Sequence, residues 1–238
     1  MTDTQTTPDA VRSVLDRIDA TFDDAVDRLS DLLRIPSIST DSAYDGETRR
    51  AATWCSGQLA DIGFESSVRD TDGHPMVVAH LHEAGEDAPR VLYYAHYDVQ
   101  PPDPLELWES PPFEPVIRES PHGRKIVARG AVDDKGQLML FVEAFRAWRA
   151  EHGRLPVNVT VLLEGEEESG SPSLDPFLEA HQEELRADTC VVSDTGMWTV
   201  DIPAITYMLR GLVYGDITLH GPERDLHSGM YGCTVVNP

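Results

Sequence analysis

The 238-residue sequence predicts an α/β protein whose central sheet is largely parallel or mixed. Short apolar runs, rich in valine and bounded by turn residues, are typical of strands. Amphipathic helical patterns precede these runs and also lie between the later ones. Strands that alternate with helices along a chain indicate an α/β domain.

Two helices are expected before the first strand. From Ala10 to Leu33 apolar residues recur at spacings of three and four, which indicates one amphipathic helix, and Pro36 ends it. A second helix is expected from Thr48 to Ile62, with Gly63 just after its last turn.

The later part of the chain alternates strands with helices. The expected strands are Met76–Leu81, Arg90–Ala95, Lys125–Ala128, Val157–Leu163 and Thr189–Ser193. Helices are expected at Lys135–Arg149 and Leu174–Leu185. The segment Pro101–Pro115 contains six prolines, at positions 101, 102, 104, 111, 112 and 115, so we expect an irregular loop long enough to form the wall of a pocket.

The pattern changes near Ala204. Two adjacent runs, Ile205–Leu209 and Leu212–Leu219, are typical of an antiparallel pair of strands that starts a different module. We therefore expect one domain over residues 1–204 and the beginning of a second over residues 205–238.

Composition excludes several classes of partner. The 42 acidic and 19 basic residues give a net charge of −23, which repels nucleic acid and anionic membranes. Only Lys125 and Lys135 are lysines, and an acidic, lysine-poor surface suits high salt, so a halophilic source is one hypothesis and ordinary acidic composition the alternative. No apolar run approaches the ~18 residues of a membrane span. The polar start MTDTQTTPDA does not resemble a secretory signal, so we expect a cytoplasmic protein.

The three cysteines give no sign of chemistry. Cys55, Cys190 and Cys233 are far apart and form no CxxC pair, so we expect them to be reduced and mostly buried.

Polar clusters follow four of the predicted strands. They are His96 with Asp98, Asp133 with Asp134, Glu166–Glu168, and Asp194. The carboxyl ends of strands in an open α/β sheet converge on the ligand crevice. Because crowded carboxylates repel one another, cations are the simplest explanation for such a gathering.

Each cluster also has a simpler interpretation when taken alone. His96 and Asp98 point to the same side of an extended chain, so Asp98 could orient a metal-bound imidazole or merely cap the strand end. Asp133-Asp134 precedes a helical pattern and could be an N-cap. Glu166–Glu168 could be a solvated turn, although the flanking glycines let the backbone approach a ligand. Asp194 could be a loop cap.

The ordered set of motifs is more specific than any one of them. It comprises IPSIS at 35–39, YAHYDVQP at 94–101, RGAVDDKGQL at 129–138, LEGEEESGS at 163–171, SDT at 193–195 and DLHSG at 225–229. In this order they resemble the M20 metallopeptidase family, and its carnosinase-like dipeptidase branch in particular. The resemblance implies an aminopeptidase-type catalytic domain with an inserted α+β lid domain that dimerises.

The resemblance also implies a role for each residue. His96 and Asp194 resemble ligands of one divalent cation, Asp133 resembles a carboxylate that bridges two cations, and Glu168 resembles a ligand of the second. Glu167 resembles the general base that activates water, and Asp98 resembles the support of His96. The cations would be zinc, with manganese or cobalt as alternatives.

His227, in DLHSG, resembles the lid histidine that reaches the active site of a partner subunit, which implies a homodimer; a surface turn histidine is the alternative. Family members are about twice this length, and the resemblance implies that their second half supplies another histidine to the second cation. We therefore expect residues 1–238 alone to bind one cation well and to show little peptidase activity. A deacylase of N-acyl amino acids and a non-catalytic, metal-binding fragment remain alternatives to a dipeptidase.

Overall fold

A computed structural model describes residues 8–235 and contains one five-stranded mixed sheet. Its strand order is β1-β2-β6-β3-β7, with antiparallel pairs β1/β2 and β2/β6 and parallel pairs β6/β3 and β3/β7. The strands are β1 (Glu65–Arg69), β2 (Met76–Leu81), β3 (Arg90–His96), β6 (Asn158–Glu164) and β7 (Thr189–Val192). The predicted α/β class and mixed sheet are therefore confirmed.

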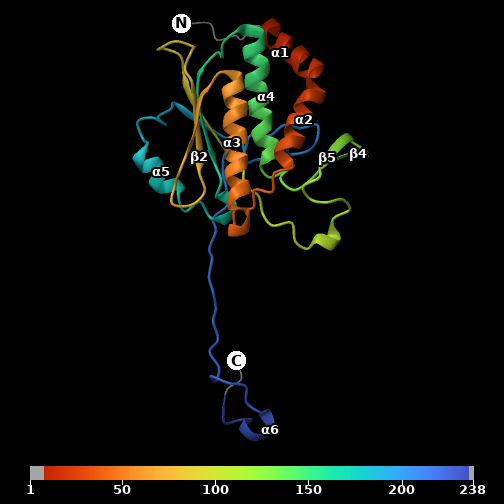
Figure 1. The fold of residues 1–238 in the computed structure, drawn as a ribbon, viewed down its shortest axis with the longest axis vertical. Coiled ribbons are helices and arrows are strands. Elements are labelled where there is room, and N and C mark those ends of the chain that lie inside the picture. The colour runs from red at the N-terminus through yellow and green to blue at the C-terminus, as the bar shows by residue number, and fades with distance from the viewer. Residues whose placement is uncertain (1–7, 236–238) are drawn as a thin grey trace.

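Helices cover both faces of this sheet (Figure 1). The α-helices are α1 (Pro8–Ala20), α2 (Phe22–Leu33), α3 (Asp45–Ile62), α4 (Lys135–His152), α5 (Leu174–Ala180) and α6 (Ser228–Tyr231). The main core joins α3 and α4 to one face of the sheet, and a smaller core joins α5 to the other. Every residue of β6 is buried, because this central strand has a packed layer on each side.

The expected helix over residues 10–33 is wrong as a single element. It is two helices, α1 and α2, separated at Thr21, whose φ of −114° and ψ of 17° are not helical. The Thr21 hydroxyl donates to the Arg17 carbonyl at 3.0 Å, a local bond of the kind that bends helices. The break lets α1 and α2 each contact α4. Apolar periodicity continues through such a break and does not reveal it.

Other elements differ from the sequence-based expectations in extent or place. The strand expected at 125–128 belongs to a separate hairpin of β4 (Val116–Ser120) and β5 (Gly123–Val127), not to the central sheet. The helix expected from Leu174 ends at Ala180 rather than Leu185. β1 and β4 were not expected, because their alternation of polar and apolar residues is weak. Gly63 does end α3 as expected, in the left-handed conformation with φ of 108°.

The two runs expected to pair as strands, 205–209 and 212–219, form no strand in the structure. They lie in the extended segment that leaves the sheet after β7 and leads to α6 (Figure 1). Ile205, Val213 and Ile217 are each more than nine-tenths exposed. A lone pair of strands is marginal without a third strand or a helix to bury its apolar face, and none packs on this segment in residues 8–235.

The proline-rich loop is irregular, as expected, apart from one 3₁₀ turn, η2 (Leu105–Leu107). The Trp108 indole donates to the Pro102 carbonyl at 2.7 Å, and the Arg129 guanidinium lies over the Trp108 ring. The loop lines a cavity of about 430 Å³ together with β4 and β5. None of the predicted site residues lines that cavity.

Two sequence-based expectations about side chains and membranes can be compared directly. All three cysteines are free, but only Cys55 is buried, so the expectation of mostly buried cysteines is wrong: Cys190 lies on the edge strand β7 and Cys233 follows α6. No helix in the described part of the chain is long and apolar enough to cross a bilayer.

The turn after α5 is held to β1 and β2 by Glu184. Arg69 donates to both oxygens of Glu184 at 2.6 and 2.5 Å, and His80 Nε2 lies 2.9 Å from Oε1. The hydrogen bonds from Arg69, with a smaller contribution from His80, lower the pKa of Glu184 to about 2. The folded state therefore favours the ionised form of this carboxyl.

Replacing Glu184 is expected to destabilise the fold in a pH-dependent way. Because the pKa of Glu184 is lower in the folded state, its contribution to the stability of the fold is complete at pH values above the ordinary glutamate pKa of ~4.3. That contribution is lost as the pH falls toward 2. Because both partners are partly exposed, screening leaves about 1 kcal/mol for Glu184→Gln at neutral pH. Denaturant unfolding at pH 7 and pH 3 measures it. Glu183→Gln, at a 91% exposed side chain, is the matched control; an equal loss in both variants, or one independent of pH, would contradict the expectation.

Candidate metal centre

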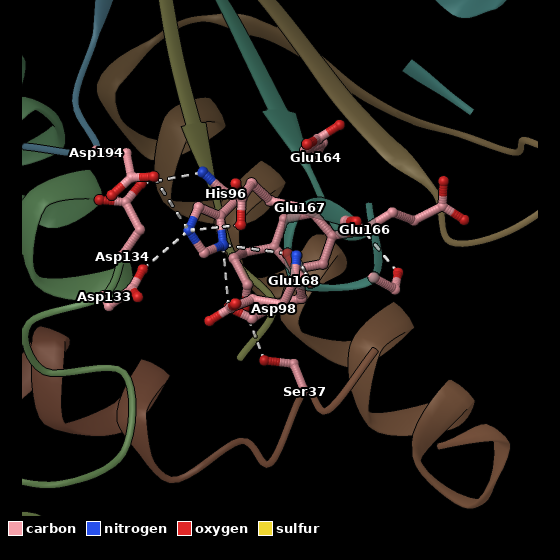
Figure 2. A network of polar contacts seen from close by, with 12 residues as sticks. Ser37, His96, Asp98, Asp133, Asp134, Glu164, Glu166, Glu167, Glu168 and Asp194 are labelled. Carbon is pink, nitrogen blue, oxygen red and sulfur yellow. Dashed lines mark hydrogen bonds and ion pairs between the residues drawn. The ribbon is translucent and has the colours of Figure 1, made fainter. Parts of the chain in front are cut away.

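Three side chains of metal-ligand type meet at the carboxyl edge of the sheet. His96 ends β3, Asp133 lies in the loop before α4, and Asp194 follows β7. Nε2 of the buried His96 lies 3.2 Å from Asp133 Oδ1 and 4.0 Å from Asp194 Oδ2. One ligand atom from each residue lies within 4.8 Å of the other two (Figure 2). The group exists because β3 and β7 are parallel neighbours whose carboxyl ends coincide.

Asp98 holds the other ring nitrogen of His96. His96 Nδ1 lies 3.2 Å from Asp98 Oδ1 and 3.2 Å from the Asp98 carbonyl oxygen, and both side chains are fully buried. Burial works against the imidazolium, but the hydrogen bond to Asp98 and its charge outweigh burial and raise the pKa of His96 to about 10. With Nδ1 engaged, Nε2 faces the cluster, as in a histidine that binds metal.

Asp133 and Asp134 are adjacent but have opposite environments. The Asp133 side chain is 57% exposed, whereas Asp134 is fully buried. Asp134 Oδ2 accepts a hydrogen bond from the His96 backbone N–H at 3.1 Å, and its Oδ1 has no hydrogen-bond partner. Burial raises the pKa of Asp134 to about 7. Asp134 occupies the N-cap position of α4, as the simpler interpretation expected, but its carboxylate makes no cap bond to the helix.

Lys135, the first residue of α4, ties this loop to the end of α2. Its Nζ donates to the carbonyls of Leu32 at 3.2 Å and Ile35 at 2.7 Å, and its side chain is fully buried. Burial lowers the pKa of Lys135 to about 7. A cation is favoured at the C-terminal end of α2, where Nζ lies. These two bonds fix the start of α4, and with it the loop that carries Asp133.

The acidic run after β6 forms the 3₁₀ turn η3 (Glu167–Ser169), and its glutamates face different ways. Glu167 Oε2 lies 4.0 Å from His96 Nε2, on the side of the metal-ligand cluster. Burial raises the pKa of Glu167, which makes its carboxylate a better proton acceptor than an ordinary glutamate. Glu166 is only 2% exposed and turns away from the cluster. The run is therefore not a solvated turn.

Glu168 lies beside the cluster but outside its set of three. Its Oε2 accepts from Gln100 Nε2 at 2.8 Å, and its backbone N–H donates to Asp98 Oδ2 at 3.1 Å. Asp98 therefore contacts both His96 and the backbone of η3. Gln100 and Asp98 together join the chain after β3 to the acidic turn.

Glu164 is a buried polar residue that the sequence analysis did not single out. It is the last residue of β6, opposite His96 in the parallel register. Its Oε1 accepts from the Tyr94 hydroxyl at 2.7 Å and the Ser171 hydroxyl at 2.6 Å, and its Oε2 has no partner. Burial raises the pKa of Glu164. A glutamate directly after the apolar run Val161–Leu163 was the available signal, hidden by the three glutamates that follow.

His227 is not part of the cluster. It precedes α6, at the far end of the extended segment that leaves the sheet (Figure 1). The side chain is exposed, and its Nδ1 accepts from the Gly229 backbone N–H at 3.0 Å. Within residues 8–235 it contacts none of the other predicted site residues.

The cluster has the chemistry of a cation site. One imidazole nitrogen and two carboxylates within 4.8 Å form a mixed N/O donor set that suits zinc, manganese or cobalt. Asp98, Asp134 and Glu167 add negative charge around them, and one buried oxygen of Asp134 lacks any partner. So much negative charge around one imidazole calls for a cation to balance it.

The chain matches a known family over most of this region. The model of Peptidase family M20/M25/M40 matches residues 92–228, which include most of β3, all of β6 and β7, and the whole cluster. The chain belongs to this family of peptidases, as the motifs predicted.

Its relatives include dipeptidases. The chain is 35% identical over 232 residues to the Cys-Gly metallodipeptidase dug1 of Schizosaccharomyces pombe, covering 93% of this chain and 48% of the relative. It is 34% identical over 173 residues to the Beta-Ala-His dipeptidase of Homo sapiens, covering 71% of this chain and 33% of the relative.

Solved structures agree with these relatives. The dipeptidase Dug1p from Saccharomyces cerevisiae superposes with a TM-score of 0.78 at 29% identity, over 94% of this chain and 49% of that one. Human carnosine dipeptidase 1 superposes with a TM-score of 0.74 at 28% identity, with the same coverage of 94% and 49%. The chain spans about half the length of the Cys-Gly metallodipeptidases of Schizosaccharomyces pombe and Saccharomyces cerevisiae.

Proposed function

We propose that this chain carries the catalytic metal centre of a peptidase that hydrolyses dipeptides. The observation that carries the proposal is the His96–Asp133–Asp194 set, with the carboxylate of Glu167 4.0 Å from His96 Nε2. The dipeptidase names of the relatives support peptide-bond hydrolysis and dipeptide substrates.

Two divalent cations are proposed, zinc first and manganese or cobalt as alternatives. His96, Asp133 and Asp194 would hold one of them. Asp133, the most exposed of the cluster, would bridge to the second, with Glu168 as a further ligand of that cation. Asp98 would keep Nε2 of His96 directed at the first cation through its contact with Nδ1.

The proposed reaction is addition of water to the amide carbon, with formation of the C–O bond and cleavage of the C–N bond. When bound, the cations supply Lewis-acid chemistry that polarises the carbonyl and acidifies water. Glu167 would accept the proton of the attacking water on its carboxylate and deliver it to the leaving amine nitrogen. Because burial raises the pKa of Glu167, its carboxylate is a better proton acceptor in the first of these transfers than that of an ordinary glutamate.

The division into domains and the homodimer are part of the same proposal. Residues 1–204 would form catalytic structure, and residues 205–238 would begin the lid domain through which two subunits associate. His227 would then act in the active site of a partner subunit. The exposed apolar residues of the extended segment support this, because such a surface favours burial against another element. A cytoplasmic location and a halophilic source stay predictions.

Metal analysis of residues 1–238 tests the centre directly. After chelation and desalting, one equivalent of Zn²⁺ or Mn²⁺ is expected to bind tightly per chain, and His96→Ala should remove it. His122→Ala is the matched control, because His122 is an exposed histidine at the β4–β5 turn. A protein that binds no cation, or equal loss in the two variants with both still folded, would refute the site.

A substrate panel tests the reaction class. In the complete protein, dipeptides are expected to turn over faster than N-acetyl amino acids. Preferential release of acetate from the latter would identify a deacylase instead.

A further inference from the structure

Glu166 is a buried carboxylate next to the proposed catalytic glutamate, but it is bound elsewhere. Its Oε1 accepts from the His74 backbone N–H at 2.7 Å, and its Oε2 accepts from the Ser173 backbone N–H at 3.0 Å. These donors belong to the β1–β2 turn and to the residue before α5. One side chain therefore joins three segments of the chain. Figure 2 shows that it is directed away from His96.

The β1–β2 turn is shaped to receive this carboxylate. A Cβ atom at Gly73 would lie 1.6 Å from Glu166 Oε1 and 2.8 Å from its Cδ, so no side chain fits there while the carboxylate keeps its place. The turn is closed by Thr71, whose hydroxyl donates to the His74 carbonyl at 2.7 Å and accepts from the Gly73 N–H at 3.1 Å. His74 Nε2 lies 3.0 Å from the Ser39 carbonyl, which anchors the turn to the rest of the fold.

The backbone of Glu166 also closes the acidic turn. Its carbonyl accepts from the N–H groups of Ser169 at 3.0 Å and Ser171 at 2.8 Å. Glu167 and Glu168 lie between Glu166 and these donors. The direction of their side chains therefore depends on where Glu166 is held.

We propose that Glu166 is a positioning residue, which orients η3 so that Glu167 and Glu168 face the metal centre. Charge-assisted bonds to two backbone donors are directional, and an apolar side chain of similar size would fill the space without fixing the turn. Its removal would also leave two buried N–H groups without partners. The inference rests on the roles proposed above for Glu167 and Glu168.

A double-mutant cycle in the complete protein tests the proposal. Glu166→Ala is expected to weaken the second cation about 10-fold and lower kcat about 10-fold, with KM and the first cation little changed, because misplacement of a catalytic group costs rate. Gly73→Ala should have the same effect, since its methyl group would displace the carboxylate. The double variant should be no worse than either single one, because loss of the carboxylate makes room for the methyl group.

Two further variants complete the design. Glu166→Gln keeps one acceptor and nearly the same volume, so it should recover part of both losses. Glu183→Ala, at an exposed glutamate beyond α5, should change nothing. Calorimetric titration with Mn²⁺ resolves the two cations, and thermal unfolding confirms that each variant folds.

The possible results separate this inference from the proposed function. Additive effects in the cycle, or wild-type kcat and second-cation affinity in Glu166→Ala, would overturn the positioning role. If Glu166→Gln loses both cations and also its thermal unfolding transition, Glu166 is needed only for folding, and the positioning role is overturned as well. Wild-type activity in Glu167→Gln would instead overturn the proposed function.

Discussion

Glu167→Gln is expected to lower the turnover of dipeptides by the complete protein ~10²–10⁴-fold while cations stay bound. The amide has nearly the volume of the carboxylate but cannot accept the proton of water. Glu167 is not one of the three residues whose ligand atoms cluster, so the first cation should be unaffected. Steady-state kinetics together with metal analysis of the same samples measure both effects.

Glu168→Gln is the matched comparison, one residue away on the same turn. It should weaken the second cation, because Glu168 is its proposed ligand, and turnover should recover when that cation is added in excess. If both variants hold metal equally and Glu167→Gln still turns over, the roles of the two glutamates have been assigned in the wrong register.

Asp98→Ala is expected to weaken the first cation about 10–100-fold, the usual cost of removing the partner of a metal-bound histidine. The change removes the carboxylate at His96 Nδ1 and the acceptor of the Glu168 N–H. Competition with a chromophoric chelator measures the affinity.

Asp98→Asn distinguishes the charge of the Asp98 side chain from its capacity to accept a hydrogen bond. It keeps an acceptor oxygen but removes the charge, so its loss of affinity should be smaller than that of Asp98→Ala. Wild-type affinity in Asp98→Ala would show that the Asp98 carbonyl alone, also 3.2 Å from Nδ1, holds the ring.

The three residues of the cluster could be predicted from the positions at which strands end. His96, Asp133 and Asp194 could be grouped from the sequence because each follows a predicted strand and parallel strands end at one edge. The rule applied even though Asp133 follows β5, which lies outside the central sheet. Its loop still reaches the edge, since Lys135 ties the start of α4 to the end of α2.

Local pattern was less informative about irregular backbone. In the acidic run, neither helical nor strand periodicity applies, so the separate directions of Glu166, Glu167 and Glu168 could not be deduced from spacing. The break at Thr21 was hidden because apolar spacing continues across it. Residues 205–219 have a strand-like composition, but in the described part of the chain no other strand pairs with them and no helix packs on them.

The sequence by itself determined the class of fold, the family and the set of candidate ligands. These depend on residue type, order and hydrophobic period, which are local properties of the chain. Only the tertiary structure decided which carboxylates meet His96 and which turn inward. The direction of each carboxylate depends on burial and on backbone donors that are distant in sequence. The His74 N–H can donate to Glu166 because the β1–β2 turn lies beside the acidic turn in the folded chain. A buried carboxylate is stable only where a cation or N–H groups compensate its charge. Both kinds of site are formed by segments that are far apart in the chain.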